Sequence, residues 1–234
     1  MRFDLASEWR LSCGRKGIPE IPVQLPGDNY SALLDSGLIP DPCIGLNENA
    51  VQWVHECDWT FAKEFELEPE FLASKVIFLN IDSIDTFGEI RINGGFAGRS
   101  ENMFSRFRTD VKKLLKPGLN RIENLIKSPS RRALEESRKQ PFELVSLKFM
   151  NSVPHMNLIR KVQCHGGWDW GITLVGSGLP RVLRVRGGEG PVCRFQRQQF
   201  HTSSGKSARA DLCRGFDQRG TRTPFGNPRP ARIL

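Results

Sequence analysis

The short segment around residue 169 combines side chains that are suited to binding a sugar. Trp168 and Trp170 flank Asp169, and glycines precede and follow the three residues. An indole face stacks on the C–H face of a sugar ring, and a carboxylate accepts charge-assisted hydrogen bonds from neighbouring hydroxyl groups. Two tryptophans at positions i and i+2 are also typical of the buried face of a strand. From the residues alone, a sugar contact and a core strand both remain open.

The cysteines and histidines do not form a metal-binding pattern. The chain has six cysteines and four histidines, with no CxxC pair and no spacing typical of zinc ligands. We therefore expect reduced, buried thiols, no bound metal and no cofactor.

The charge of the chain is concentrated at one end. Residues 181–234 hold 12 of the 34 basic residues and 3 of the 26 acidic residues, so that residues 1–180 are almost neutral. A nucleic-acid-binding domain carries its basic residues across a folded surface, and we therefore expect no nucleic-acid partner. Asp4 and Glu8 stand where a secretory signal needs an apolar core, and no run of 18 apolar residues occurs. These features predict a cytoplasmic protein without a membrane partner.

The elements that must position residues 168–170 are predicted to be mainly strands. The first 60 residues contain five prolines and are predicted to be loop-rich, with one helix over residues 29–36 between an Asp28 N-cap and Gly37. Alternating or apolar patterns predict strands at 60–67, 75–81, 87–93, 104–111 and 120–126. Asn93-Gly94 indicates a hairpin, and residues 116–118 (KPG) indicate a turn.

Short strands at regular spacing with Gly and Pro turns predict a mainly β, antiparallel sandwich. Residues 130–140 are predicted to form a solvated helix in an exposed insertion. Near the C-terminus, only residues 197–212 have the pattern of a strand pair, and the Gly-, Arg- and Pro-rich composition from Gly215 onward predicts disorder.

Five segments of the chain resemble, in order, the N-terminal sugar-binding domain of the β-mannosidases of glycoside hydrolase family 2. The segments are LPGDNYSALLDSGLIPDPCIGLNE, VQWVHECDWTF, IDSIDTFGEIRING, GRSENMFSRFRTDV and NLIRKVQCHGGWDWGITLVGSG. The resemblance as a whole extends over residues 9–178. The LPGD…GLIPDP and HxGWDWG signatures favour β-mannosidases over the galactosidase and glucuronidase branches of the family.

The resemblance implies a fold, a domain division and a site. It implies a jelly-roll-like antiparallel β-sandwich, similar to galactose-binding domains, over residues 1–185. Residues 186–214 then resemble the start of an immunoglobulin-like domain, and residues 215–234 form the disordered tail. The family's substrate contacts correspond here to Trp168, Asp169 and Trp170, which help to hold the terminal mannose. Asn102 is a further candidate contact, although capping a turn is the simpler role for its polar side chain. Arg160 and His165 lie near this segment as orienting groups, and His165 is expected to be a satisfied structural histidine.

The resemblance also implies that catalysis takes place elsewhere. In these enzymes a (β/α)₈ barrel carries both catalytic glutamates, and a retaining mechanism needs both carboxylates about 5 Å apart in one site. This chain ends before such a barrel, so we assign no catalytic residue and expect the chain to be inactive alone. After Gly178 the family pattern breaks, and a frameshift or a mispredicted gene model is our hypothesis for residues beyond about 180.

Three functions remain open at this point. The first is a fragment of a β-mannosidase, an enzyme that hydrolyses terminal non-reducing β-D-mannose residues, with a β-mannoside or mannose as partner and the barrel as packing partner. The second is a non-catalytic carbohydrate-binding module. The third is a non-functional truncated product whose exposed domain interface causes aggregation.

Overall fold

The computed structural model describes residues 1–145, 153–181, 183–188, 196–201 and 207–212. The predicted disorder from Gly215 onward lies outside these residues. The chain divides into two compact units, Met1–Glu189 and Gly190–Leu234. In the second unit β13 (Gln196–His201) and β14 (Ser207–Leu212) form an antiparallel hairpin, which confirms the strand pair predicted over 197–212.

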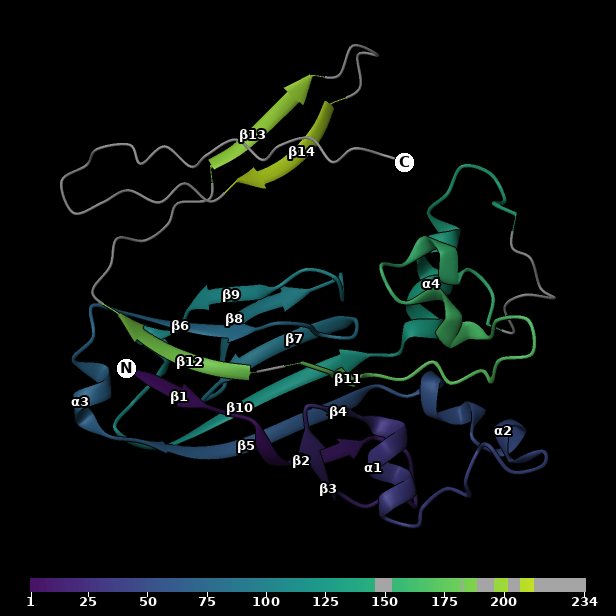
Figure 1. The fold of residues 1–234 in the computed structure, drawn as a ribbon, viewed down its shortest axis with the longest axis horizontal. Coiled ribbons are helices and arrows are strands. Elements are labelled where there is room, and N and C mark those ends of the chain that lie inside the picture. Colours follow the sequence, from purple (N-terminus) through teal and green to yellow (C-terminus); the bar gives the residue numbers. More distant parts are fainter. Residues whose placement is uncertain (146–152, 182, 189–195, 202–206, 213–234) are drawn as a thin grey trace, which may run out of the picture. The chain divides into compact units, whose positions relative to one another are not determined.

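The first unit is built on two antiparallel sheets (Figure 1). The larger sheet has the order β3-β2-β5-β10-β7-β8 and the smaller sheet has the order β1-β12-β6-β9. The strands of the larger sheet are β2 (Ser7–Cys13), β3 (Ile21–Leu25), β5 (Trp59–Leu67), β7 (Phe87–Ile92), β8 (Gly95–Ser100) and β10 (Gly118–Lys127). Those of the smaller sheet are β1 (Arg2–Asp4), β6 (Val76–Ile81), β9 (Phe107–Asp110) and β12 (Leu183–Gly188).

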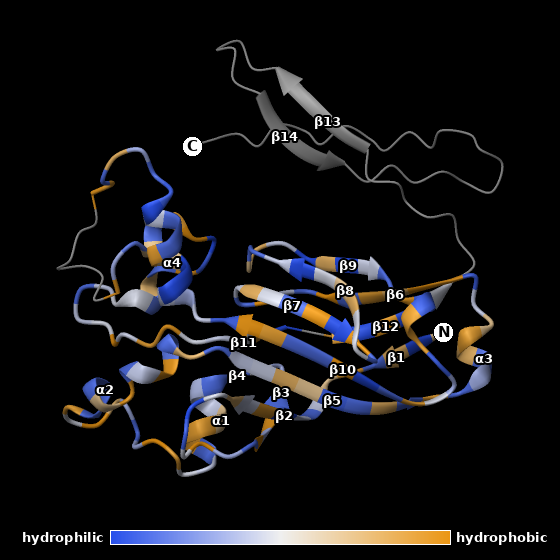
Figure 2. Cartoon of the chain, turned by 180° about the vertical axis from the view of Figure 1, so that it is seen from behind, coloured by the Kyte–Doolittle hydropathy of each residue, from blue (hydrophilic) through white to orange (hydrophobic). Residues whose placement is uncertain are grey.

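One core fills the space between the two sheets. Buried residues alternate with exposed ones along β3 and with partly exposed ones along β6, as expected for strands with one face on the core. Trp9 and Phe61 of the larger sheet and Leu79 and Val185 of the smaller sheet belong to the same buried cluster. Figure 2 shows the resulting alternation of hydrophobic and hydrophilic residues along the strands. The predicted mainly β, antiparallel sandwich is therefore confirmed.

The first 60 residues contain more strand than predicted. Residues 7–13 and 21–25 form β2 and β3, although Pro22 lies within β3 and suggested a loop. Pro22 lies opposite Arg10, and β3 is the edge strand of the larger sheet. An edge strand tolerates proline because one of its two sides needs no ladder hydrogen bond. The loop-rich prediction for this region was therefore wrong at these two strands.

The predicted N-terminal helix is confirmed as α1 (Asn29–Asp35). The Asp28 carboxylate caps it by accepting hydrogen bonds from the backbone N–H groups of Tyr30 and Ser31, at 2.9 and 3.1 Å. Gly37 follows the helix with a φ of 66°, a left-handed conformation that favours glycine.

The Asn93-Gly94 hairpin is confirmed between β7 and β8, because both turn residues have positive φ. The 116–118 turn has a different role from a hairpin. The preceding strand, β9, lies in the smaller sheet, and the following strand, β10, lies in the larger one. This turn therefore lies on the connection by which the chain crosses from one sheet to the other.

The helix predicted over 130–140 is present as α4 (Pro129–Arg138), which is largely hydrophilic in Figure 2. One face is nevertheless buried: Ala133 packs in a small second core with Val153, Met156 and Val175. The predicted exposed insertion is therefore only half exposed. Among the described residues, every helix is too short or too polar to cross a lipid bilayer.

Short elements complete the first unit. They are β4 (Gly27–Asp28), α2 (Asn47–Ala50), η1 (Gln52–Glu56), α3 (Pro69–Leu72), η2 (Lys112–Leu114), η3 (Met156–Leu158), η4 (Gln163–Gly166) and β11 (Gly178–Leu179). Figure 1 shows α1, α2 and α4 gathered toward one end of the sandwich and α3 toward the other. The segment between η4 and β11 carries residues 168–170.

Candidate functional site

Trp168 to Gly171 form a tight turn. The backbone N–H of Gly171 donates to the carbonyl oxygen of Trp168 at 2.5 Å, and Asp169 takes a left-handed conformation with a φ of 46°. A Cβ atom on Gly171 would lie 2.8 Å from the Trp168 carbonyl oxygen, so that the turn needs glycine at this position. The sequence WDWG thus forms a turn with Asp169 and Trp170 at its tip.

The turn presents its side chains to solvent. The exposed fraction is 54% for Trp168 and 96% for Trp170, and Asp169 is also exposed. The alternative of a buried strand face is therefore wrong for these tryptophans. Apolar rings of this size are normally among the most buried parts of a protein, and two of them beside a carboxylate form a surface suited to a partly apolar, hydroxyl-rich ligand.

Asp85 joins the two ends of the segment that carries the turn. Its carboxylate accepts a hydrogen bond from the Lys161 ammonium group at 2.5 Å, and its backbone exchanges two hydrogen bonds with Gly178, at 2.9 and 3.1 Å. The Lys161 ammonium group also donates to the carbonyl oxygen of Gly176 at 2.6 Å. Burial lowers the pKa of Lys161, while the Asp85 charge opposes this effect. Residues 161–178 therefore form a loop closed at its base.

A cavity of about 570 Å³ lies beside this base. Its lining includes the carboxylates of Asp28 and Asp85, together with His165 and the apolar side chains of Ile172 and Leu174. The sequence indicated Asp28 only as a helix cap, and it did not indicate Asp85. Nothing in the IDSID segment distinguishes Asp85 from Asp82, since only the fold brings one of them beside Lys161.

His165 is not the satisfied structural histidine that was expected. Its Nδ1 atom is buried and has no hydrogen-bond partner among the described residues, and it lies 3.8 Å from an oxygen of Asp85. Burial lowers the pKa of His165, the Lys161 charge lowers it further, and Asp85 and Asp28 act in the opposite direction. Arg160, the other expected orienting residue, has an exposed side chain.

Asn102 caps a turn. Its side-chain oxygen accepts a hydrogen bond from the backbone N–H of Phe104 at 3.0 Å. The same loop touches the start of the 161–178 loop, because the N–H of Met103 donates to the carbonyl oxygen of Arg160 at 3.1 Å. Asn102 therefore lies near the base of the loop rather than in the turn at its tip.

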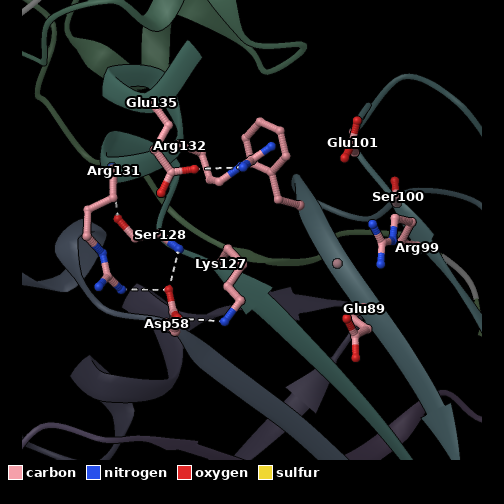
Figure 3. A pocket seen from close by; sticks show the side chains of 12 residues that line it. Asp58, Glu89, Arg99, Ser100, Glu101, Lys127, Ser128, Arg131, Arg132 and Glu135 are labelled. Carbon is pink, nitrogen blue, oxygen red and sulfur yellow. Dashed lines mark hydrogen bonds and ion pairs between the residues drawn. The ribbon is translucent and has the colours of Figure 1, made fainter. Parts of the chain in front are cut away.

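A second polar pocket, of about 360 Å³, lies between α4 and the strands β7 and β8 (Figure 3). The Asp58 carboxylate accepts hydrogen bonds from Arg131 at 2.6 Å, from the Ser128 backbone N–H at 2.8 Å and from Lys127 at 3.1 Å. Burial raises the pKa of Asp58, but the hydrogen bonds from Ser128 and Lys127 and the nearby positive charges outweigh it and hold the pKa below its ordinary value. The positive charges of Arg131 and Lys127 are thus already paired with Asp58.

The four cysteines among the described residues differ in burial. Cys43 and Cys164 are exposed and Cys13 and Cys57 are partly buried, so that the prediction of buried thiols is wrong for the first two. Among the residues that the structure describes, no three His, Cys, Asp or Glu side chains form a group that could hold a metal ion.

Comparison with known proteins places this architecture in a family. Residues 9–181 match a family model, that of the galactose-binding domain-like region of the glycosyl hydrolase 2 enzymes. The chain belongs to this family. The β-mannosidase of Mus musculus is 30% identical over 191 residues, which are 78% of this chain and 21% of the mouse protein. β-Mannosidase B of Aspergillus clavatus is 35% identical over 189 residues, which are 79% of this chain and 22% of the fungal protein.

Solved structures agree with this assignment. The β-D-mannosidase of Dictyoglomus thermophilum is 33% identical and has a TM-score of 0.74. The match covers 84% of this chain and 23% of the mannosidase chain. The exo-chitosanase CsxA of Amycolatopsis orientalis shares the fold at 14% identity, with a TM-score of 0.55 over 88% of this chain and 23% of that chain. The present chain spans about a fifth of the length of the β-mannosidases that it matches.

Proposed function

We propose that this domain forms the non-catalytic wall of a β-mannosidase site and contacts the terminal β-D-mannose residue of a β-mannoside. The observation that carries the proposal is the exposed turn, in which Asp169 stands between two exposed indole rings. Mannose differs from glucose in its axial O2, and a fixed carboxylate accepts a hydrogen bond from that hydroxyl group. Either ring offers a face for stacking on the sugar.

The cleavage step belongs to another part of the enzyme in this proposal. A retaining glycosidase needs an acid/base carboxylate and a nucleophilic carboxylate about 5 Å apart. We place this pair in the barrel domain of the family and expect the protruding turn to reach toward it. Asp169 then has a binding role in the site and no part in proton transfer. Asn102, which caps its own turn, is retained only as a contact near the edge of the site.

The separation of sugar binding from cleavage is tested by incubating a chromogenic β-mannoside with the purified chain and, in parallel, with its Asp169→Ala variant. We expect no turnover from either protein. Turnover that Asp169→Ala abolishes would contradict the proposal, because a catalytic carboxylate pair would then have to lie within this chain.

Binding is tested separately by titrating the chain with methyl β-D-mannopyranoside and recording the indole resonances. We expect Trp168 and Trp170 to respond, with a dissociation constant on the order of millimolar, because much of the sugar stays in water when only one wall is present. Methyl β-D-glucopyranoside, which differs at C2, is the matched control ligand and should bind more weakly. Equal response to the two sugars would contradict a role of Asp169 in reading O2.

A carbohydrate-binding module that acts without a barrel is the second candidate. It is favoured by the 96% exposure of Trp170, since an isolated sugar-binding surface needs a freely accessible ring. The same titration distinguishes the two functions. A dissociation constant well below millimolar for the chain alone supports the module, whereas millimolar binding supports an incomplete enzyme site.

A further inference from the structure

The loop that carries the tryptophan turn is fastened at its base by one buried side chain. The loop runs from Lys161 to Gly178, where β11 begins. The Lys161 ammonium group donates to Asp85 at 2.5 Å and to the Gly176 carbonyl oxygen at 2.6 Å, and so it spans the two ends. Asp85 also holds Gly178 through two backbone hydrogen bonds.

The environment of this contact restricts its geometry. The side chain of Lys161 has no exposed surface, and that of Asp85 is 7% exposed. The second oxygen of Asp85 accepts a hydrogen bond from the Thr86 hydroxyl group at 2.5 Å, so that the carboxylate is fixed from two sides. A buried ammonium group must keep its partners, because leaving one charge without the other in a dry environment is costly. Lys161 is thus held in one arrangement and holds both ends of the loop in register.

Between the base and the turn, the loop has further support. The Gln163 side chain donates to the carbonyl oxygens of Met156 and Lys161 at 2.9 and 3.0 Å, and Val175 is buried in the second core.

Thr173, which lies nearer to the turn, is also held. Its backbone N–H donates to Glu48 at 2.8 Å, and its carbonyl oxygen accepts from Gln52 at 3.0 Å. Residues 168–170 lie outside these contacts and are exposed. The direction in which the turn points is therefore set by these contacts together, and among them the buried Lys161 side chain is the contact that joins the two ends of the loop.

We propose that Lys161 is the positioning residue of the Trp168–Asp169–Trp170 turn, acting through Asp85 and the Gly176 carbonyl oxygen. This role rests on the proposed function in so far as the turn is taken to contact a mannoside. Lys161 itself is buried under the loop and does not touch the sugar. Within the described part of the chain, the exposed side chain of its neighbour Arg160 has no hydrogen bond or ion pair with residues 176–178.

The test uses the full chain labelled with 5-fluorotryptophan, which gives one fluorine signal for each of its five tryptophans. The variants are Lys161→Met and the double variant Lys161→Met/Asp85→Asn, in which no buried charge is left unpaired. Lys113→Met, at an exposed lysine, is the control. Each protein is also titrated with methyl β-D-mannopyranoside.

A positioning role predicts that the Trp168 and Trp170 signals shift or broaden in both Lys161 variants. The signals of Trp9 and Trp59, which are buried in the core, should stay unchanged in the double variant. The affinity for the mannoside should fall at least tenfold, and Lys113→Met should behave as the parent chain does.

Two results would overturn the proposal. One is unchanged Trp168 and Trp170 signals, with unchanged affinity, in a Lys161 variant whose core signals are native. The other is a change of the Trp9 and Trp59 signals in both Lys161 variants, which would show a general structural role. If the parent chain does not respond to the mannoside while the turn signals still depend on Lys161, the proposed function fails and the positioning role stands.

Discussion

Two ion-paired clusters in this domain use the same chemistry in different surroundings. At the base of the 161–178 loop, Lys161 meets Asp85 with side-chain exposures of 0% and 7%. In the pocket beside α4, Arg131 and Lys127 meet Asp58 with exposures of 57%, 48% and 31%. Water screens the second cluster and leaves the first unscreened. The comparison teaches that the number of ion pairs is a poor guide to their effect on stability. The burial of each pair, and the segments of chain that it joins, are better guides.

The largest expected effect is that of Lys161→Met. This change leaves Asp85 buried without its partner, and it should lower the free energy of unfolding by about 3–5 kcal/mol. Urea denaturation followed by core tryptophan fluorescence measures it. Lys113→Met, at an exposed position, should stay within about 0.5 kcal/mol of the parent chain. A loss of unfolding free energy below about 1 kcal/mol in Lys161→Met would contradict the argument that burial strengthens the Lys161–Asp85 ion pair.

The double variant Lys161→Met/Asp85→Asn sharpens the same point. Removing both charges eliminates the unpaired buried carboxylate, and replaced buried pairs are often close to neutral in stability. We expect the double variant to be more stable than Lys161→Met by about 1 kcal/mol or more, as measured by urea denaturation. With Asp85→Asn as the second single variant, the double-mutant cycle then gives the coupling between the two charges. Strict additivity of the two single changes would show that the charges do not interact.

A smaller effect is expected for Asp58→Asn. The change weakens the hydrogen bond from Ser128 at the start of α4 and removes the attraction to Arg131 and Lys127, and should cost about 1 kcal/mol near neutral pH. Because folding holds the pKa of Asp58 below its ordinary value of 3.8, its contribution is complete from about one pH unit above 3.8 and is lost as the pH falls through the lowered value.

Urea denaturation of Asp58→Asn and the parent chain across this pH range measures the difference, which should shrink as the solution becomes acidic. Added salt should also reduce it, since the cluster is partly exposed. A difference that grows toward low pH would contradict the sign of the pKa change.

The smallest effect on stability is expected for Trp170→Ala. With 96% of its surface exposed, Trp170 contributes little packing, and the change in unfolding free energy should stay within about 0.5 kcal/mol. Binding of methyl β-D-mannopyranoside should nevertheless be lost. Phe96→Ala, at a side chain that is 51% exposed in β8, is the matched control and should leave both stability and binding unchanged. Retained binding in Trp170→Ala would remove this ring from the site.

Local sequence signals predicted several elements well. Asp28 and Gly37 marked the ends of α1, and Asn93-Gly94 marked the β7–β8 hairpin, because these residues act through their own backbone. Pro22 was misleading, since its effect depends on whether its strand lies at the edge of the sheet. The charged helix α4 was predicted correctly as a helix, but its buried face depends on Val153 and Val175, which come later in the chain.

The sequence by itself determined the family, the alternation of the strands and the residues of the tryptophan turn. Only the tertiary structure decided that this turn is exposed and that Lys161, rather than Arg160, is the buried member of its pair. It also decided that Asp85, rather than Asp82, forms the ion pair with Lys161. The reason is physical: Lys161 and Asp85 are 76 positions apart, and their burial arises from the packing of segments that no local pattern connects.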